Sequence, residues 1–146
     1  MADAPTPTPA DFPYLRTIST RWKDNDVYGH VNNVEYYSYF DSAINTYLIR
    51  EGDLDIAGGP TIGVCAQSQC RFLASVSFPG DVRCGVRVGR LGRTSATYEL
   101  GLFDEAGALV AEGSFTHVFV DRESRRPVPI PDGLRGALGR LVVGKG

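Results

Sequence analysis

The sequence has few of the residues that build metal sites and disulfide frameworks. It contains three cysteines and two histidines in 146 residues. Cys65, Cys70 and Cys84 form no C-x-x-C motif and no cluster with histidine at metal-ligand spacing. We therefore expect free thiols in a reducing compartment, and we expect neither a metal site nor a cofactor.

The chain also lacks a basic excess, a signal peptide and a long apolar run. Fifteen basic residues face seventeen acidic ones, so there is no large basic field for nucleic-acid phosphates. The first residues lack the basic start and apolar run of a signal peptide. No apolar stretch approaches the roughly 20 residues that cross a bilayer. These absences predict a cytoplasmic protein that binds neither nucleic acid nor a membrane.

Length and composition favour one folded domain. With 146 residues, 42% of them hydrophobic, the chain can bury one core but is short for two. Residues 1–13 alternate proline with small or polar residues, and this composition predicts a disordered tail. Residues 14–146 are predicted to form a single domain.

The hydrophobic pattern predicts one long helix and five strands. Asn32 can cap a helix over residues 32–50, and Glu35 three residues later completes a capping-box pattern. Most apolar side chains of this helix share one stripe: Tyr36, Phe40, Ala43, Ile44, Tyr47 and Leu48. Alternating patterns predict strands at 14–23, 61–74, 81–90, 94–103 and 108–121. One helix against a large antiparallel sheet is an α+β fold, in which the sheet has to curl around the helix.

Residues 21–39, RWKDNDVYGHVNNVEYYSY, combine the chemistry of a possible site with a helix start. Free N–H groups in the first helical turn can polarise a carbonyl oxygen and stabilise an oxyanion. A carboxylate just upstream can attack the carbonyl carbon or activate water. The segment therefore suits hydrolysis of an acyl group. Turn formation explains the same residues without any chemistry, because Asp, Asn and Gly are common in turns and caps.

The stretch D-N-D-V-Y-G-H-V-N-N-x-x-Y-x-x-Y resembles the signature of the hotdog-fold acyl-CoA thioesterases, of the 4-hydroxybenzoyl-CoA thioesterase type. The resemblance covers residues 14 to 135, including RFLASVSFPGDVRCGVRVGRLGRTS, EGSFTHVFVD and RRPVPIPDGLR. It implies a long central helix wrapped by a curled antiparallel sheet of about five strands. It also implies a homodimer or homotetramer in which the sheets of two subunits join and the active sites lie at their interface.

On this resemblance the catalytic residues are Asp26, Asn33 and His30. Asp26 matches the family's catalytic aspartate, as nucleophile or as general base, and the sequence leaves that choice open. The backbone N–H of Asn33 matches the group that polarises the carbonyl. His30 matches a histidine of the plant acyl-carrier-protein thioesterases, but Tyr28 stands where those enzymes have asparagine. His30 therefore either acts directly or orients the loop.

The resemblance also implies four substrate-binding residues. Gly29 matches a turn of the family pattern, and Tyr36 would line the acyl pocket, although core packing explains it equally well. The loop LGRTS makes Arg93 the first candidate for contact with the CoA phosphates and Arg90 the second. The implied reaction is hydrolysis of an acyl-CoA to a free acid and CoA. The alternatives are a non-catalytic acyl-CoA-binding hotdog protein and a thioesterase acting on acyl-carrier-protein esters.

Overall fold

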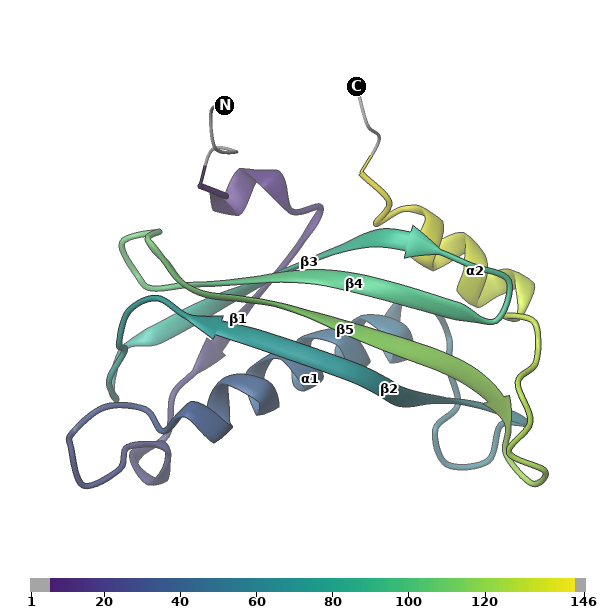
Figure 1. Cartoon of the computed structure of the whole chain (residues 1–146), viewed down its shortest axis with the longest axis horizontal. Coiled ribbons are helices and arrows are strands. Elements are labelled where there is room, and N and C mark those ends of the chain that lie inside the picture. Colours follow the sequence, from purple (N-terminus) through teal and green to yellow (C-terminus); the bar gives the residue numbers. More distant parts are fainter. Residues whose placement is uncertain (1–5, 144–146) are drawn as a thin grey trace.

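A computed structural model of the chain describes residues 6–143 and contains one antiparallel sheet curled around a helix (Figure 1). The strands are β1 (Tyr14–Ser19), β2 (Thr61–Phe72), β3 (Asp81–Leu91), β4 (Ser95–Phe103) and β5 (Leu109–Asp121). The helices are α1 (Asn33–Arg50) and α2 (Asp132–Gly139), and two 3-10 turns, η1 (Pro9–Asp11) and η2 (Trp22–Asp24), flank β1. The predicted α+β hotdog fold is confirmed.

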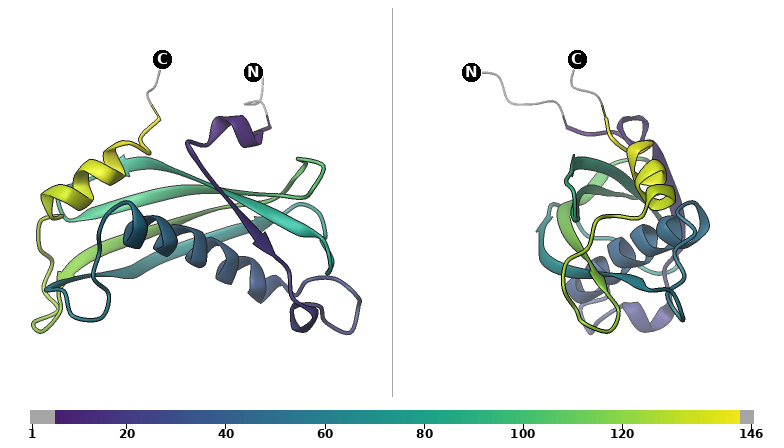
Figure 2. Two further views of the ribbon diagram at one scale, coloured as in Figure 1. Left: turned by 180° about the vertical axis from the view of Figure 1, so that it is seen from behind. Right: turned by 90° about the vertical axis from the view of Figure 1, so that its right-hand side faces the viewer.

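The strand order is β1-β3-β4-β5-β2, and every neighbouring pair is antiparallel. The sheet bends around α1, as the end-on view in Figure 2 shows. Strand β2 forms one edge over 12 residues, and its pairing with β5 shifts register between Cys65 and Gln67. A long edge strand presents unpaired backbone N–H and C=O groups along its free side.

Helix α1 begins where its cap predicts. The Asn32 side chain accepts a hydrogen bond from the Val34 N–H at 3.0 Å. The second half of the predicted capping box is wrong, because the Asn32 N–H donates to the Asp24 carbonyl at 2.9 Å. Glu35 instead lies 3.4 Å from the Arg21 guanidinium. The buried stripe of α1 contains the predicted residues and one more, Tyr39.

The core lies between the inner face of the sheet and α1, and α2 closes one end of it. Leu134, Ala137 and Leu138 of α2 are buried. The Tyr47 hydroxyl on α1 donates to the Ala137 carbonyl at 2.6 Å, which joins the two helices. No helix in the described part of the chain is long and apolar enough to span a membrane.

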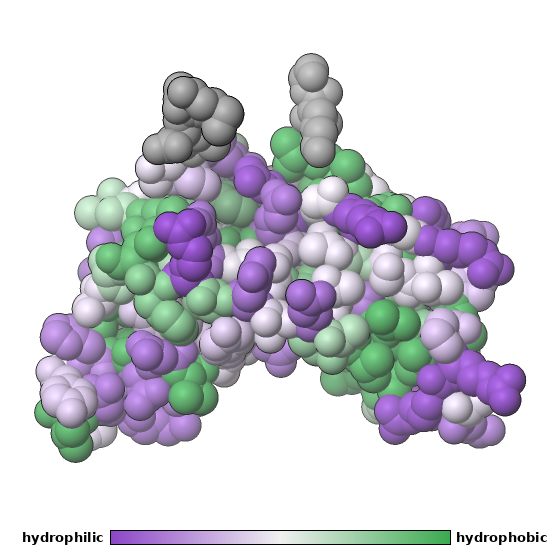
Figure 3. Space-filling model, viewed as in Figure 1, coloured by the Kyte–Doolittle hydropathy of each residue, from purple (hydrophilic) through white to green (hydrophobic). Residues whose placement is uncertain are grey.

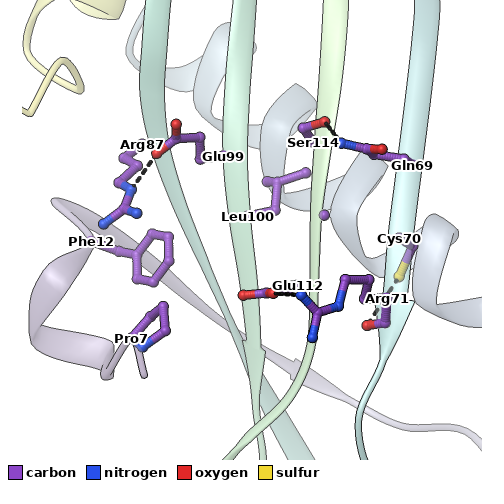
Figure 4. Close-up of a pocket in the computed structure, with 11 residues that line it drawn as sticks. Pro7, Phe12, Gln69, Cys70, Arg71, Arg87, Glu99, Leu100, Glu112 and Ser114 are labelled. Atoms are coloured by element: carbon purple, nitrogen blue, oxygen red, sulfur yellow. Dashed lines mark hydrogen bonds and ion pairs between the residues drawn. The ribbon is translucent and has the colours of Figure 1, made fainter. Parts of the chain in front are cut away.

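The N-terminal segment lies against the outer face of the sheet through Phe12 (Figure 4). Phe12 is 6% exposed and lies over Gly85 and Gly101. A Cβ at either glycine would come within 3 Å of the Phe12 ring, so only glycine leaves room for it. The Arg87 guanidinium lies 4.8 Å from the centre of the ring. Residues 6–13 therefore have a defined structure, unlike the disordered tail predicted over residues 1–13. Residues 1–5 of that prediction lie outside the described residues.

A hollow of about 440 Å³ adjoins Phe12 on this outer face. Its charged side chains are paired across the strands, Arg87 with Glu99 at 2.8 Å and Arg71 with Glu112 at 3.2 Å (Figure 4). The same face of the molecule carries scattered hydrophilic side chains between apolar ones (Figure 3). Because these charges already have partners within the chain, the hollow needs no ligand to satisfy them.

Candidate active site

Residues 20–32 join β1 to α1 (Figure 1) and carry Asp26 and His30, and the third predicted catalytic residue, Asn33, begins α1. The Asp26 N–H donates to the His30 carbonyl at 2.9 Å, and the Gly29 N–H donates to the Asp26 carbonyl at 3.0 Å. These two bonds close a tight turn over residues 26–30. Gly29 has a φ of 82°, a conformation that glycine adopts without the cost other residues meet. Gly29 therefore allows the backbone to make this turn.

Asp26 is the carboxylate that this turn presents. Its side chain is half-buried. Oδ1 accepts a hydrogen bond from the Tyr28 N–H at 2.9 Å. Within residues 6–143, Oδ2 accepts no hydrogen bond, which leaves one carboxylate oxygen free to act on a bound molecule.

The segment between β2 and β3, about fifty residues later in the sequence, forms hydrogen bonds with the turn and its neighbours. Three hydrogen bonds join the two segments: Val31 N–H to the Val76 carbonyl at 2.8 Å, Ser77 Oγ to the Gly29 carbonyl at 3.0 Å, and Phe78 N–H to Asn25 Oδ1 at 3.1 Å. Trp22 packs edge-on against Phe78, with the ring centres 5.9 Å apart. The turn is therefore fixed by tertiary contacts as well as by its own backbone.

The first turn of α1 leaves one donor free next to this carboxylate. The Val34 N–H donates to the Asn32 side chain and the Glu35 N–H to the Asn32 carbonyl. The Asn33 N–H has no acceptor among the residues that the structure describes. Because the positive end of the helix dipole coincides with this group, it is suited to hold a carbonyl oxygen or an oxyanion.

These groups face one hollow of about 500 Å³. Its lining comes from the loop between β1 and α1, the start of α1, and the end of β2 with the residues that follow it: Asp26, Tyr28, His30, Val31, Asn32, Asn33, Tyr36, Phe72, Leu73, Ala74 and Ser75. The Tyr36 hydroxyl donates to the Ala74 carbonyl at 3.2 Å, and its ring lies 5.2 Å from that of Phe72. The hollow thus combines a carboxylate and a helix start with an aromatic wall.

The structure brings together four of the seven predicted site residues. Asp26, His30, Asn33 and Tyr36 all line the hollow, and Gly29 lines an adjoining one with Trp22 and Val27. Arg90, near the end of β3, and Arg93, in the turn between β3 and β4, are both exposed. That turn lies beside α2, at the opposite end of the sheet from the start of α1 (Figure 1).

The sequence does not indicate several of the lining residues. Phe72, Leu73 and Ser75 reach the hollow only because the end of β2 lies beside the start of α1. No residue pattern in the sequence predicts which segments will lie beside the start of α1. The adjacent aromatic and aliphatic residues in RFLAS are the one feature that indicates an apolar wall. Asp24, which sequence alone explains as a turn cap, proves to be 1% exposed and bound to Tyr39.

The second histidine lies elsewhere. His117 is buried on β5, with Nδ1 3.1 Å from the Tyr98 hydroxyl. Burial lowers the pKa of His117, which favours the neutral ring expected of a core residue. Across residues 6–143 no three His, Cys, Asp or Glu side chains gather as a metal site would require.

Comparison with known proteins gives consistent matches. The model of the thioesterase-like superfamily matches residues 20–138. A crystal structure of the PA5185 protein from Pseudomonas aeruginosa strain PAO1 is 51% identical, with a TM-score of 0.93, and the match covers 97% of this chain and 100% of that one.

Two further relatives are more distant. A thioesterase from Thermus thermophilus, solved in complex with coenzyme A and zinc, is 30% identical with a TM-score of 0.74, over 87% of this chain and 98% of that one. The YsmA protein of Bacillus subtilis (strain 168) is 26% identical over 121 residues, which are 83% of this chain and 82% of YsmA.

Proposed function

Because the chain belongs to the thioesterase-like superfamily and is a thioester hydrolase, we propose that it hydrolyses acyl-CoA esters with Asp26 as the catalytic carboxylate. The observation that carries the proposal is that Asp26 and the free N–H of Asn33 line one hollow. The coenzyme A complex of the Thermus relative supports CoA as the thiol half of the substrate.

In the proposed reaction the thioester carbonyl oxygen accepts a hydrogen bond from the Asn33 N–H. Oδ2 of Asp26 then follows one of two routes. It attacks the carbonyl carbon, which forms a mixed anhydride and expels the CoA thiolate, and water hydrolyses the anhydride. Alternatively it takes a proton from water, and the resulting hydroxide attacks the same carbon. Either route gives a free acid and CoA, and the Asn33 N–H stabilises the oxyanion in both.

The backbone of His30 helps to hold Asp26 in place. Its carbonyl accepts the Asp26 N–H and so fixes the turn. Its exposed ring also lines the hollow, where a histidine is able to give a proton to the departing thiolate. The loop-orienting role and the direct role predicted for His30 are both compatible with this place.

The proposed active enzyme contains a second copy of the chain joined along β2. An unpaired edge of 12 residues can extend the sheet by pairing with its own copy in antiparallel orientation. Phe72, at the hollow end of β2, would then face the Thr61 end of the copy. The turn between β3 and β4 lies at the Thr61 end, because Thr61 pairs with Asp121 and Ser95 with Val118 on the same strand. Such pairing would bring Arg93 of the second copy toward the hollow.

Arg93→Ala is therefore expected to raise KM for CoA esters about tenfold with kcat unchanged, because it removes one charge-assisted hydrogen bond to a phosphate. Thioesters of N-acetylcysteamine, which lack the nucleotide, should keep their KM. Steady-state kinetics on both substrate types check this, with Arg90→Ala expected to act in the same direction more weakly. Arg16→Ala, on β1 at the opposite edge of the sheet from β2, is the control. Equal losses on both substrate types would contradict the phosphate contact.

Thiol release from a panel of acyl-CoAs, short, long and aromatic, tests the proposed function. We expect turnover of at least one member. Tight binding of acyl-CoA without turnover of any member would favour the non-catalytic binding protein. Turnover of acyl-carrier-protein esters alone would favour the second alternative, a thioesterase for carrier-protein substrates.

A further inference from the structure

Asp24 is a buried carboxylate for which the proposed reaction has no use. It is 1% exposed, whereas Asp26, two residues later, is half-buried beside the hollow. Burial of an ionised carboxylate costs free energy unless the group is paired and hydrogen-bonded. The contacts of Asp24 therefore indicate which structural role offsets this cost.

Both carboxylate oxygens of Asp24 are engaged. Oδ1 accepts a hydrogen bond from Arg21 Nε at 3.1 Å and lies 3.0 Å from Arg21 Nη2. Oδ2 accepts hydrogen bonds from the Tyr39 hydroxyl at 2.7 Å and the Arg21 N–H at 2.9 Å. Burial disfavours ionisation of Asp24, but the hydrogen bonds from Tyr39 and Arg21 outweigh it. The pKa of Asp24 lies below its ordinary value, so the group is ionised at neutral pH.

These contacts tie the loop between β1 and α1 to the start of α1 at three points. Tyr39 lies on the second turn of the helix. The Arg21 guanidinium also reaches Glu35 on the first turn, at 3.4 Å. The Asp24 carbonyl accepts the N–H of Asn32, the residue that caps the helix, at 2.9 Å.

We propose that Asp24 is a positioning residue that holds the Asp26 carboxylate at a fixed place relative to the Asn33 N–H. Asp26 follows Asp24 by two residues, and Asn33 follows Asn32 by one. The bonds from Asp24 to Tyr39 and Asn32 therefore restrict both reacting groups together. The inference rests on the proposed function, which gives Asp26 and Asn33 their roles. A misplacement of about 1 Å can cost a reaction about 100-fold in rate, so such restriction matters to turnover.

Two tyrosines of α1 allow the positioning role to be separated from simple stabilisation. Tyr39 and Tyr47 are both buried. Each hydroxyl donates one hydrogen bond, from Tyr39 to Asp24 at 2.7 Å and from Tyr47 to the Ala137 carbonyl at 2.6 Å. Replacement of either by phenylalanine removes one buried hydrogen bond and keeps the ring. Both variants should therefore lose comparable stability.

Tyr39→Phe is expected to lower kcat about tenfold with KM within about twofold, whereas Tyr47→Phe keeps the wild-type kcat. Asp24→Asn, which is nearly isosteric, is expected to lower kcat about 100-fold. Both measurements use an acyl-CoA that the wild type hydrolyses. Trp22 is the only tryptophan and lies in η2, the turn that ends at Asp24. Its emission anisotropy should fall in Tyr39→Phe and Asp24→Asn but not in Tyr47→Phe.

Equal kcat in Tyr39→Phe and Tyr47→Phe, or a Tyr39→Phe effect confined to KM or melting temperature, would overturn the positioning role. Asp26→Asn separates this failure from that of the proposed function. An inactive Asp26→Asn with a fully active Tyr39→Phe rejects positioning alone. An active Asp26→Asn, or a wild type without turnover, rejects both. Tyr39→Phe leaves Asp24 paired with Arg21, so the test stands even if Asp24→Asn does not fold.

Discussion

Replacement of Asp26 by asparagine is expected to lower kcat for acyl-CoA hydrolysis by about 10²–10⁴-fold with little change in KM. Asparagine has the same shape, but its amide neither attacks a carbonyl carbon nor takes a proton from water. The amide oxygen can keep the hydrogen bond from the Tyr28 N–H, and backbone groups close the turn. Rate should therefore be lost without loss of the fold. Steady-state thiol release measures the rate, and a thermal melt of the same preparation measures the stability of the fold.

Asp41→Asn provides the matched control, since it makes the same chemical change on an exposed part of α1 away from the hollow. It should retain the wild-type rate. Undiminished hydrolysis by Asp26→Asn would reject Asp26 as the catalytic carboxylate. Mass spectrometry of acid-quenched wild-type enzyme then addresses the route: an acyl group on Asp26 identifies nucleophilic attack, and a substrate-saturated enzyme without one favours the general base.

Local sequence patterns predicted most of the fold because each element carries its own period. The stripe on α1 and the alternation of Val82, Cys84, Val86 and Val88 on β3 place side chains on the faces that the structure buries. Predicted and observed bounds differ most at β1. The predicted strand 14–23 ends at Ser19, because Asp24 accepts hydrogen bonds from Arg21 and Tyr39 and so bends the chain into η2. The bond to Tyr39 is a tertiary contact, which alternation along one segment does not reveal.

The candidate site was predictable as far as it is contiguous in sequence. Asp26, His30, Asn33 and Tyr36 lie within eleven residues, so a tight turn followed by a helix start brings them to one hollow. The wall of the hollow formed by the end of β2 depends on which strand lies beside α1. Strand order is a property of the whole sheet, so the pattern of a single segment does not predict it.

The place of Arg93 follows from strand direction. Ser19 at the end of β1 pairs with Asp81 at the start of β3, so β3 runs away from the loop between β1 and α1. The turn that follows β3 must therefore lie at the far end of the sheet. The family resemblance predicts a phosphate contact for Arg93 but not this separation, which a second copy of the chain would have to bridge.

Asn33→Pro is expected to lower kcat by about 10²–10³-fold, the usual cost of losing one oxyanion donor. Proline lacks the N–H that we assign to the carbonyl oxygen, and it is well accepted at the first position of a helix. It also requires the preceding residue to be extended, and Asn32 already has φ −63° and ψ 141°. The substitution therefore removes one hydrogen-bond donor without opposing the fold. Kinetics of thiol release, with melting temperature as the check on folding, measure the effect.

Asn33→Ala is the matched control because it deletes the exposed side chain and keeps the backbone N–H. If the N–H is the working group, Asn33→Ala retains nearly the wild-type kcat while Asn33→Pro loses most of it. Equal losses in both variants would instead assign the role to the side-chain amide. A fully active Asn33→Pro with an inactive Asp26→Asn would keep Asp26 as the catalytic carboxylate and require another hydrogen-bond donor for the oxyanion. The exposed ring of His30 lines the same hollow and is the next candidate for that donor.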